Sequence, residues 1–262
     1  MNRRRWRRVN STVHAVVCIA LTGCASPTLS PLRTLSPSPT VSPFPAGKPD
    51  PGPAAPEPVI TYPQRGDGVF QTATTDGPVA GHAGRLLRYR VSVEQGVTGI
   101  DATAFAEQVS GVLSDPRGWT GTGRWRLQLV PDGVPHDFVV YLATPATRDT
   151  LCAKGYDRYT SCRNGNRVVL NVARWVNSVP DYGADLATYR QYLVNHETGH
   201  RLGLGHEKCP APGRPAPVMQ QQTLGLHGCV ANGWPIVDGR PYSGPAGQYN
   251  DPIPADSVTP IR

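Results

Sequence analysis

The sequence predicts an α+β domain in which a mixed β-sheet carries its helices on one side. Three observations support this fold class. Several short segments alternate polar and apolar residues as strands do, and two longer segments repeat apolar residues with a helical period. An Asn-Gly pair separates two of the strand-like runs. The predicted order is strand, helix, four strands and helix, followed by an irregular C-terminal piece.

The first predicted strand covers residues 85–97, where polar and apolar residues alternate. Asp101 then has the character of an N-cap for a helix over residues 102–113. Apolar residues recur at helical spacing in that segment from Phe105 onward. The turn-forming sequence at 115–119 ends this helix.

Four more strands are predicted before the second helix. Residues 124–130 and 137–143 are the first two, and residues 159–163 and 167–176 follow after a loop. The Asn-Gly-Asn sequence at 164–166 predicts a hairpin between the last two. We expect the 159–163 strand to form an edge of the sheet.

The second predicted helix carries a single apolar stripe that runs from Leu186 to His200. Asp185 or Asp181 could cap its start. Gly203 fits its end, because the residue that follows a helix C-terminus is often a glycine in the left-handed conformation.

The N-terminus has the pattern of an export signal. "MNRRRWRR" is positively charged, and the apolar "VHAVVCIAL" is too short to span a bilayer, which takes roughly 20 residues. Residues 1–23 are therefore predicted to be a signal peptide. They end in "LTGC", which resembles a bacterial lipobox and implies lipid attachment at Cys24. The alternative is an ordinary secretory signal.

Charge and composition define the remaining organisation. Removing residues 1–23 deletes five arginines and no acids, so the net charge falls from +7 to +2 and gives no reason to expect nucleic-acid binding. Residues 24–64 are a Pro/Ser-rich linker, since eleven of the 28 prolines lie between residues 25 and 60. Residues 65–236 form the domain and residues 237–262 a C-terminal tail. We expect an exported monomer, either anchored to the outer face of the membrane or secreted.

The four cysteines of the domain are expected to form two disulfides, because an exported protein matures in an oxidising compartment. Proximity in sequence favours Cys152–Cys162 and Cys209–Cys229. Zinc binding by cysteines is the competing interpretation, but neither pair has the spacing that a structural zinc site prefers.

The sequence "HETGHRLGLGH", residues 196–206, contains the candidate metal ligands and catalytic residue. His196 and His200 lie four residues apart, so both project from one helix face and suit a single Zn²⁺ ion. Glu197 between them can act as general base toward a water that the ion activates. Gly203 lets the chain turn so that His206 becomes a third ligand. Gly199 is unfavourable in a helix and predicts a close approach by another segment.

These residues match HExxHxxGxxH and resemble the metzincin zinc peptidases. The resemblance implies a twisted mixed sheet, an active-site helix and an irregular C-terminal subdomain that contains a Met-turn. Met219, in "APVMQQQT", would be the methionine of that turn, supporting the ligands without binding the ion. The alternative is a core methionine that fills a gap. Nearly all of residues 80–236 also resembles a family of secreted actinobacterial proteins known only as a domain of unknown function with predicted metzincin-like activity.

The sequence thus predicts an exported zinc metalloendopeptidase that holds one catalytic Zn²⁺ ion. Its partners would be a peptide or protein substrate and the membrane, the latter through the lipid anchor at Cys24. One alternative is a zinc-stabilised, non-catalytic module that binds the cell envelope. The other is a zinc amidase acting on cell-wall peptides. Glu197 favours an enzyme, because a structural zinc site needs no base.

Overall fold

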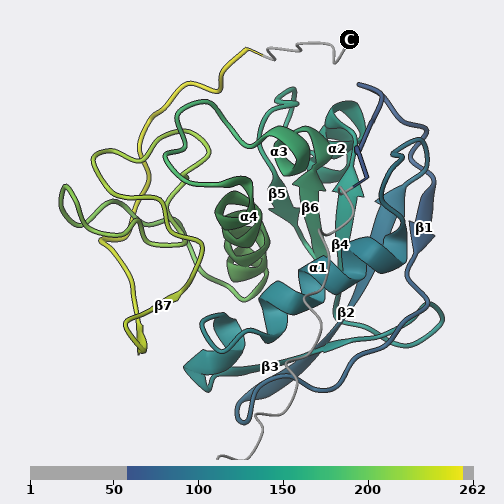
Figure 1. Cartoon of the computed structure of the whole chain (residues 1–262), viewed down its shortest axis with the longest axis horizontal. Helices are drawn as coiled ribbons and strands as arrows, with labels where there is room; N and C mark the ends of the chain where they lie inside the picture. The colour runs from purple at the N-terminus through teal and green to yellow at the C-terminus, as the bar shows by residue number, and fades with distance from the viewer. Residues whose placement is uncertain (1–57, 256–262) are drawn as a thin grey trace, which may run out of the picture. The chain divides into compact units, whose positions relative to one another are not determined.

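The computed structural model describes residues 58–255 (Figure 1). The predicted signal peptide, Cys24 and the linker up to residue 57 lie outside the described residues. The described chain is an α+β domain with a mixed sheet, which confirms the predicted fold class. No helix in this part of the chain is long and apolar enough to cross a membrane.

The main sheet has six strands: β1 (Phe70–Thr72), β2 (Arg85–Glu94), β3 (Trp125–Leu129), β4 (Phe138–Ala143), β5 (Cys162–Asn164) and β6 (Arg167–Asn171). The order is β1-β2-β4-β6-β5, and β3 also pairs with β2. Strands β2, β3, β4 and β6 pair in parallel, whereas β1 and β5 are antiparallel to their neighbours. Strand β5 is an edge, as the sequence predicts, and the hairpin at 164–166 joins it to β6.

The helices are α1 (Ala102–Ser114), α2 (Pro145–Cys152), α3 (Val172–Asn177) and α4 (Leu186–Arg201), with a 3₁₀ turn η1 (Trp119–Thr122). Asp101 is confirmed as the N-cap of α1, and of the two candidates for α4, Asp185 and Asp181, it is Asp185 that caps the helix. Asp101 accepts a hydrogen bond from the Ala104 backbone N–H (2.7 Å), and Asp185 accepts one from the Thr188 N–H (2.8 Å). A small hairpin of β7 (Ile236–Val237) and β8 (Arg240–Pro241) follows near the C-terminus.

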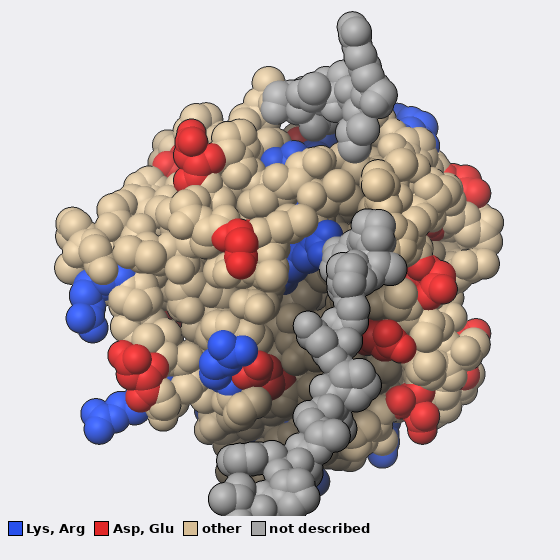
Figure 2. Space-filling model, viewed as in Figure 1, with Lys and Arg blue, Asp and Glu red and all other residues tan. Residues whose placement is uncertain are grey.

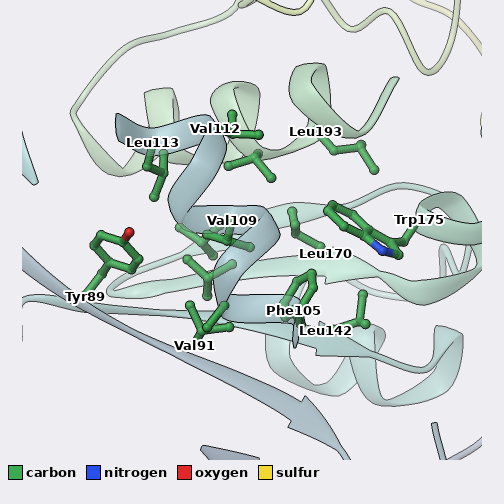
Figure 3. Close-up of a cluster of buried hydrophobic side chains, with 14 of the residues drawn as sticks. Tyr89, Val91, Phe105, Val109, Val112, Leu113, Leu142, Leu170, Trp175 and Leu193 are labelled. Carbon is green, nitrogen blue, oxygen red and sulfur yellow. The ribbon is translucent and has the colours of Figure 1, made fainter. Parts of the chain in front are cut away.

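The main core lies between one face of the sheet and helices α1 and α4 (Figures 1 and 3). Alternate residues of the parallel strands face it, such as Leu142 on β4 and Leu170 on β6, as the period of a strand requires. Phe105 of α1 packs edge-on against Trp175 of α3, with ring centroids 5.0 Å apart. Helix α4 is therefore supported along its buried side by the whole core.

The opposite face of the sheet carries a smaller cluster. Ala143 and Val169 pack there with Cys152 of α2 and Cys162 of β5. The prediction that the helices lie on one side was therefore wrong for α2. Helix α2 was not predicted, because its sequence has no stripe of apolar residues at helical spacing and begins with a proline.

Three predicted strand boundaries were also wrong. The strand predicted over residues 85–97 ends at Glu94. Residues 172–176, predicted to continue a strand, form α3, because the Asn171 side chain accepts a hydrogen bond from the Ala173 N–H (3.0 Å) and starts a helix. The strand predicted from residue 159 begins only at Cys162. The backbone N–H groups of residues 159 and 160 turn instead toward the Asp157 carboxylate.

Two disulfides are present with the predicted pairing. Cys152–Cys162 joins α2 to the edge strand β5, and Cys209–Cys229 closes the loop that contains Met219. Disulfides of this kind persist in an oxidising compartment, so they indicate an extracytoplasmic environment.

Contacts with the domain extend beyond residues 65–236 on both sides. Ile60 and Tyr62, from the segment predicted as linker, pack against the main core. In the predicted tail, the Tyr242 hydroxyl donates a hydrogen bond to the Pro215 carbonyl (2.9 Å). Both described flanks are thus part of the packed structure.

The charged side chains of the described surface do not gather by sign on the face shown in Figure 2. Acidic and basic groups are interspersed there, in keeping with the net charge of +2 that residues 24–262 carry.

Candidate metal centre

Helix α4 positions three of the predicted site residues. His196 and His200 lie one turn apart on the same side of the helix, and Glu197 follows His196 directly. His196 and Glu197 are buried, with 4% and 5% of their surfaces exposed, and His200 is half-buried. The core that holds α4 therefore also fixes the direction of these side chains.

The chain leaves α4 through Gly203, as predicted. This glycine has a φ of +94°, a left-handed conformation that disfavours other residues. The Gly203 N–H donates to the His200 carbonyl (3.1 Å), and the Leu204 N–H donates to the Gly199 carbonyl (3.0 Å). This sharp reversal returns the backbone toward the helix and places His206 beside His200.

The three imidazoles converge through their Nε2 atoms. The Nε2 of His200 lies 3.2 Å from that of His196 and 3.1 Å from that of His206. Ligands at roughly 2.0–2.1 Å on a tetrahedral zinc ion would lie about 3.3 Å apart. The spacing of the three nitrogens thus fits one small tetrahedral cation.

The other ring nitrogens decide the tautomer of each histidine. Every Nδ1 has an oxygen partner: Val218 O for His196 (2.8 Å), Leu204 O for His200 (2.9 Å) and Gln248 Oε1 for His206 (2.8 Å). A carbonyl or amide oxygen can only accept, so each Nδ1 carries the proton and each neutral ring presents an Nε2 lone pair. Three lone pairs that face one another are favourable only around a cation.

Burial keeps these rings neutral. It lowers the pKa of His196 well below its ordinary value, lowers that of His200 to about 4, and also lowers that of His206. Neutral imidazole is the form that binds a metal ion. The donor set therefore fits zinc, and His196, His200 and His206 are the residues that would hold it.

Glu197 lies buried beside the histidines. Its Oε2 has no hydrogen-bond partner among the described residues. Burial raises the pKa of Glu197 to about 8. A carboxylate in such a place needs a positive charge or a hydrogen-bond donor nearby, and a metal ion with its water would supply both.

Met219 is buried, and its sulfur lies beside Gly199 of α4. It belongs to a tight turn in which the Gln220 N–H donates to the Pro217 carbonyl (2.9 Å). The preceding carbonyl, of Val218, holds His196, and the Met219 carbonyl accepts from the Glu207 N–H (3.1 Å). The turn thus connects the first histidine to the loop that carries the third.

Gly199 allows this turn to approach the helix. A Cβ atom at Gly199 would collide with the Met219 sulfur and with the Trp119 ring. The predicted close approach is therefore confirmed, and the segments that make it are the methionine turn and η1.

Replacing Gly199 with alanine is expected to lower the free energy of unfolding by about 1–3 kcal/mol, because both neighbours are buried and must shift. Gly111 in α1 is a matched control, since a Cβ there meets nothing within 4 Å. Gly111→Ala should stabilise the protein by up to about 1 kcal/mol through helix propensity. Urea unfolding of both variants measures the difference, and equal effects would contradict the packing argument.

A cleft of about 670 Å³ opens over the histidines. One wall is the loop that the Cys152–Cys162 disulfide closes, and it carries Lys154 and Tyr156. The buried Arg148 holds this loop by an ion pair with Asp157 (2.7 Å). Residues 248–251 of the predicted tail also line the cleft. The histidines and Glu197 thus line a cleft that a ligand could enter.

Sequence reasoning missed two contributors to this site. The Val218 carbonyl, which accepts a hydrogen bond from His196, cannot be predicted from the sequence, because every residue has a backbone carbonyl. Gln248 lies 42 residues after His206 in a segment without periodicity, so no spacing rule relates the two.

The fold and site together define a class of protein: a disulfide-bonded α+β domain with three histidines that could hold a metal ion. The chain belongs to the family described as "Protein of unknown function (DUF3152)", whose family model matches residues 57–233. The three histidines, Glu197 and Met219 all lie within that range. No curated protein and no solved structure matches the chain.

Proposed function

We propose that this protein is an exported zinc metallopeptidase of the metzincin type. One observation carries the proposal: three unprotonated Nε2 atoms converge in a cleft beside a buried glutamate that has an unpaired oxygen among the described residues. The motif HExxHxxGxxH and the turn around Met219 support the same assignment.

The number of ligands favours a catalytic ion over a structural one. The cluster brings together three histidines and no fourth protein ligand among the described residues. Structural zinc sites are closed by four protein ligands, whereas catalytic sites keep one position open. The three histidines line the cleft together with Glu197, so water or substrate could reach an ion that they hold.

Glu197 would move the protons of the reaction. A zinc ion held by the three histidines supplies Lewis-acid chemistry, polarising a carbonyl group and lowering the pKa of water. The Glu197 carboxylate would accept a proton from the attacking water and then give it to the leaving amine. Its burial removes competing solvent and keeps its oxygen beside the histidines.

The substrate would be an extended peptide that pairs with the edge strand β5. Cys162 and Arg163 of β5 line the cleft, and β5 pairs with β6 on its other side. A free strand edge offers backbone hydrogen bonds to a peptide of any sequence. We also propose that lipid at Cys24 anchors the protein, with the Pro/Ser-rich linker as a spacer.

The test uses residues 25–262, loaded with zinc, beside the Glu197→Ala variant. Both are incubated with a peptide library derived from a proteome and with cell-wall peptides, and new termini are identified by mass spectrometry. Cleavage of library peptides by the wild type alone would support the peptidase. Cleavage of cell-wall peptides only would favour the amidase. If both proteins bind zinc and neither cleaves, the enzyme assignment fails and a binding module replaces it.

A further inference from the structure

We propose that residues 244–251 complete the metal centre, and that Gln248 among them is a positioning residue for the third ligand, His206. The inference rests on the proposed zinc site but concerns a different part of the chain. Gln248 lies outside the residues that the family model matches and outside the histidine motif.

The third histidine is held differently from the other two. His196 and His200 stand on a helix, and their Nδ1 atoms bond to backbone carbonyls that the fold fixes. His206 stands on a loop and is half-buried. Its Nδ1 partner is a side chain, the Gln248 Oε1 at 2.8 Å. The orientation of the His206 ring therefore depends on where Gln248 is placed.

Residues 206–208 hold the beginning of this segment. Three contacts connect them: Gly247 N–H to His206 O (2.9 Å), Lys208 N–H to Pro245 O (2.8 Å) and Gly244 N–H to Glu207 Oε2 (3.1 Å). Residues 207 and 246 also form an isolated antiparallel bridge. The segment thus runs alongside the third-ligand loop as a short added strand.

A second group of contacts holds the segment just beyond Gln248. The Tyr249 ring stacks on His227, with centroids 3.5 Å apart, and the Asp251 carboxylate lies 2.8 Å from the His227 Nε2. The Lys208 ammonium lies 5.4 Å from the centre of the Tyr249 ring. Gln248 is therefore fixed from both sides, as a residue that aims a metal ligand must be.

The chemical role of Gln248 is to accept the Nδ1 proton of His206. This keeps the proton away from Nε2, so that the lone pair points at the metal position. Loss of such a hydrogen-bond partner typically lowers metal affinity by about 10–100-fold. A carboxylate at the same place would accept the same proton, whereas an apolar side chain of similar size would not.

The experiment uses a protein that comprises residues 25–262. It measures the affinity for zinc, not the activity, by competition with a chromophoric chelator. Gln248→Leu is expected to weaken zinc binding by about 10–100-fold, and Gln248→Glu to retain wild-type affinity or exceed it. Gln108→Leu is the matched control, because Gln108 is exposed on α1 and is not among the residues that line the cleft. It should bind zinc with the affinity of the wild type. In the absence of metal, all variants should have the same Tm as the wild type.

Each result separates the two proposals. If the wild type binds zinc and Gln248→Leu binds it equally well, the role of Gln248 is overturned while the metal site stands. Loss of affinity in Gln248→Glu as large as in Gln248→Leu overturns the acceptor role. If the wild type binds no zinc, both the site and this inference fail.

Discussion

Replacing Glu197 with glutamine is expected to lower kcat/KM for peptide hydrolysis by about 10²–10⁴-fold, the usual contribution of a general acid–base group. Glutamine keeps the size of the side chain but cannot accept a proton. Its position on α4 is fixed by the same core, so the three histidines stay in place. A fluorogenic peptide identified in the cleavage screen would measure the rate.

The zinc content distinguishes loss of chemistry from loss of the ion. Glu197→Gln should bind one zinc per chain, as the wild type does, when measured by elemental analysis. Glu107→Gln, on the exposed side of α1, is the control and should leave both rate and zinc content unchanged. Full activity in a zinc-loaded Glu197→Gln protein would remove Glu197 from the mechanism.

Opening the Cys209–Cys229 disulfide should have the largest effect on stability. The double variant Cys209→Ser/Cys229→Ser is expected to lose about 2–5 kcal/mol of unfolding free energy, because a cross-link limits the freedom of the unfolded chain. The bond closes a loop across 20 residues of sequence. That loop contains Met219 and the Val218 carbonyl that holds His196, so zinc affinity should fall as well.

The other disulfide provides the comparison. Cys152→Ser/Cys162→Ser removes the cross-link of a shorter loop, so it should lower the free energy of unfolding less. It leaves the methionine turn intact, so the affinity for zinc should not change. Urea unfolding in chelator gives the stabilities, and chelator competition gives the affinities. Equal zinc affinity in both double variants would contradict the link between the 209–229 loop and the histidine cluster.

Local patterns predicted much of the framework. Asp101 and Asp185 marked the starts of α1 and α4, because a capping side chain acts on N–H groups within the same turn. Gly203 marked the end of α4 for the same local reason. By contrast, α2 and α3 were missed, since neither has enough residues to show a period, and Asn171 resembles any other polar residue at the end of a strand.

The sequence by itself determined the histidine constellation and the class of fold. Helical spacing places His196 and His200 on one face whatever surrounds them, and a glycine at 203 permits the reversal that brings His206. Only the tertiary structure decided which oxygens hold these rings. The Val218 carbonyl and Gln248 reach them from segments 22 and 42 residues away, and no period in a sequence records a contact between distant loops. Packing of the whole chain brings those loops together, so only the folded molecule shows the completed centre.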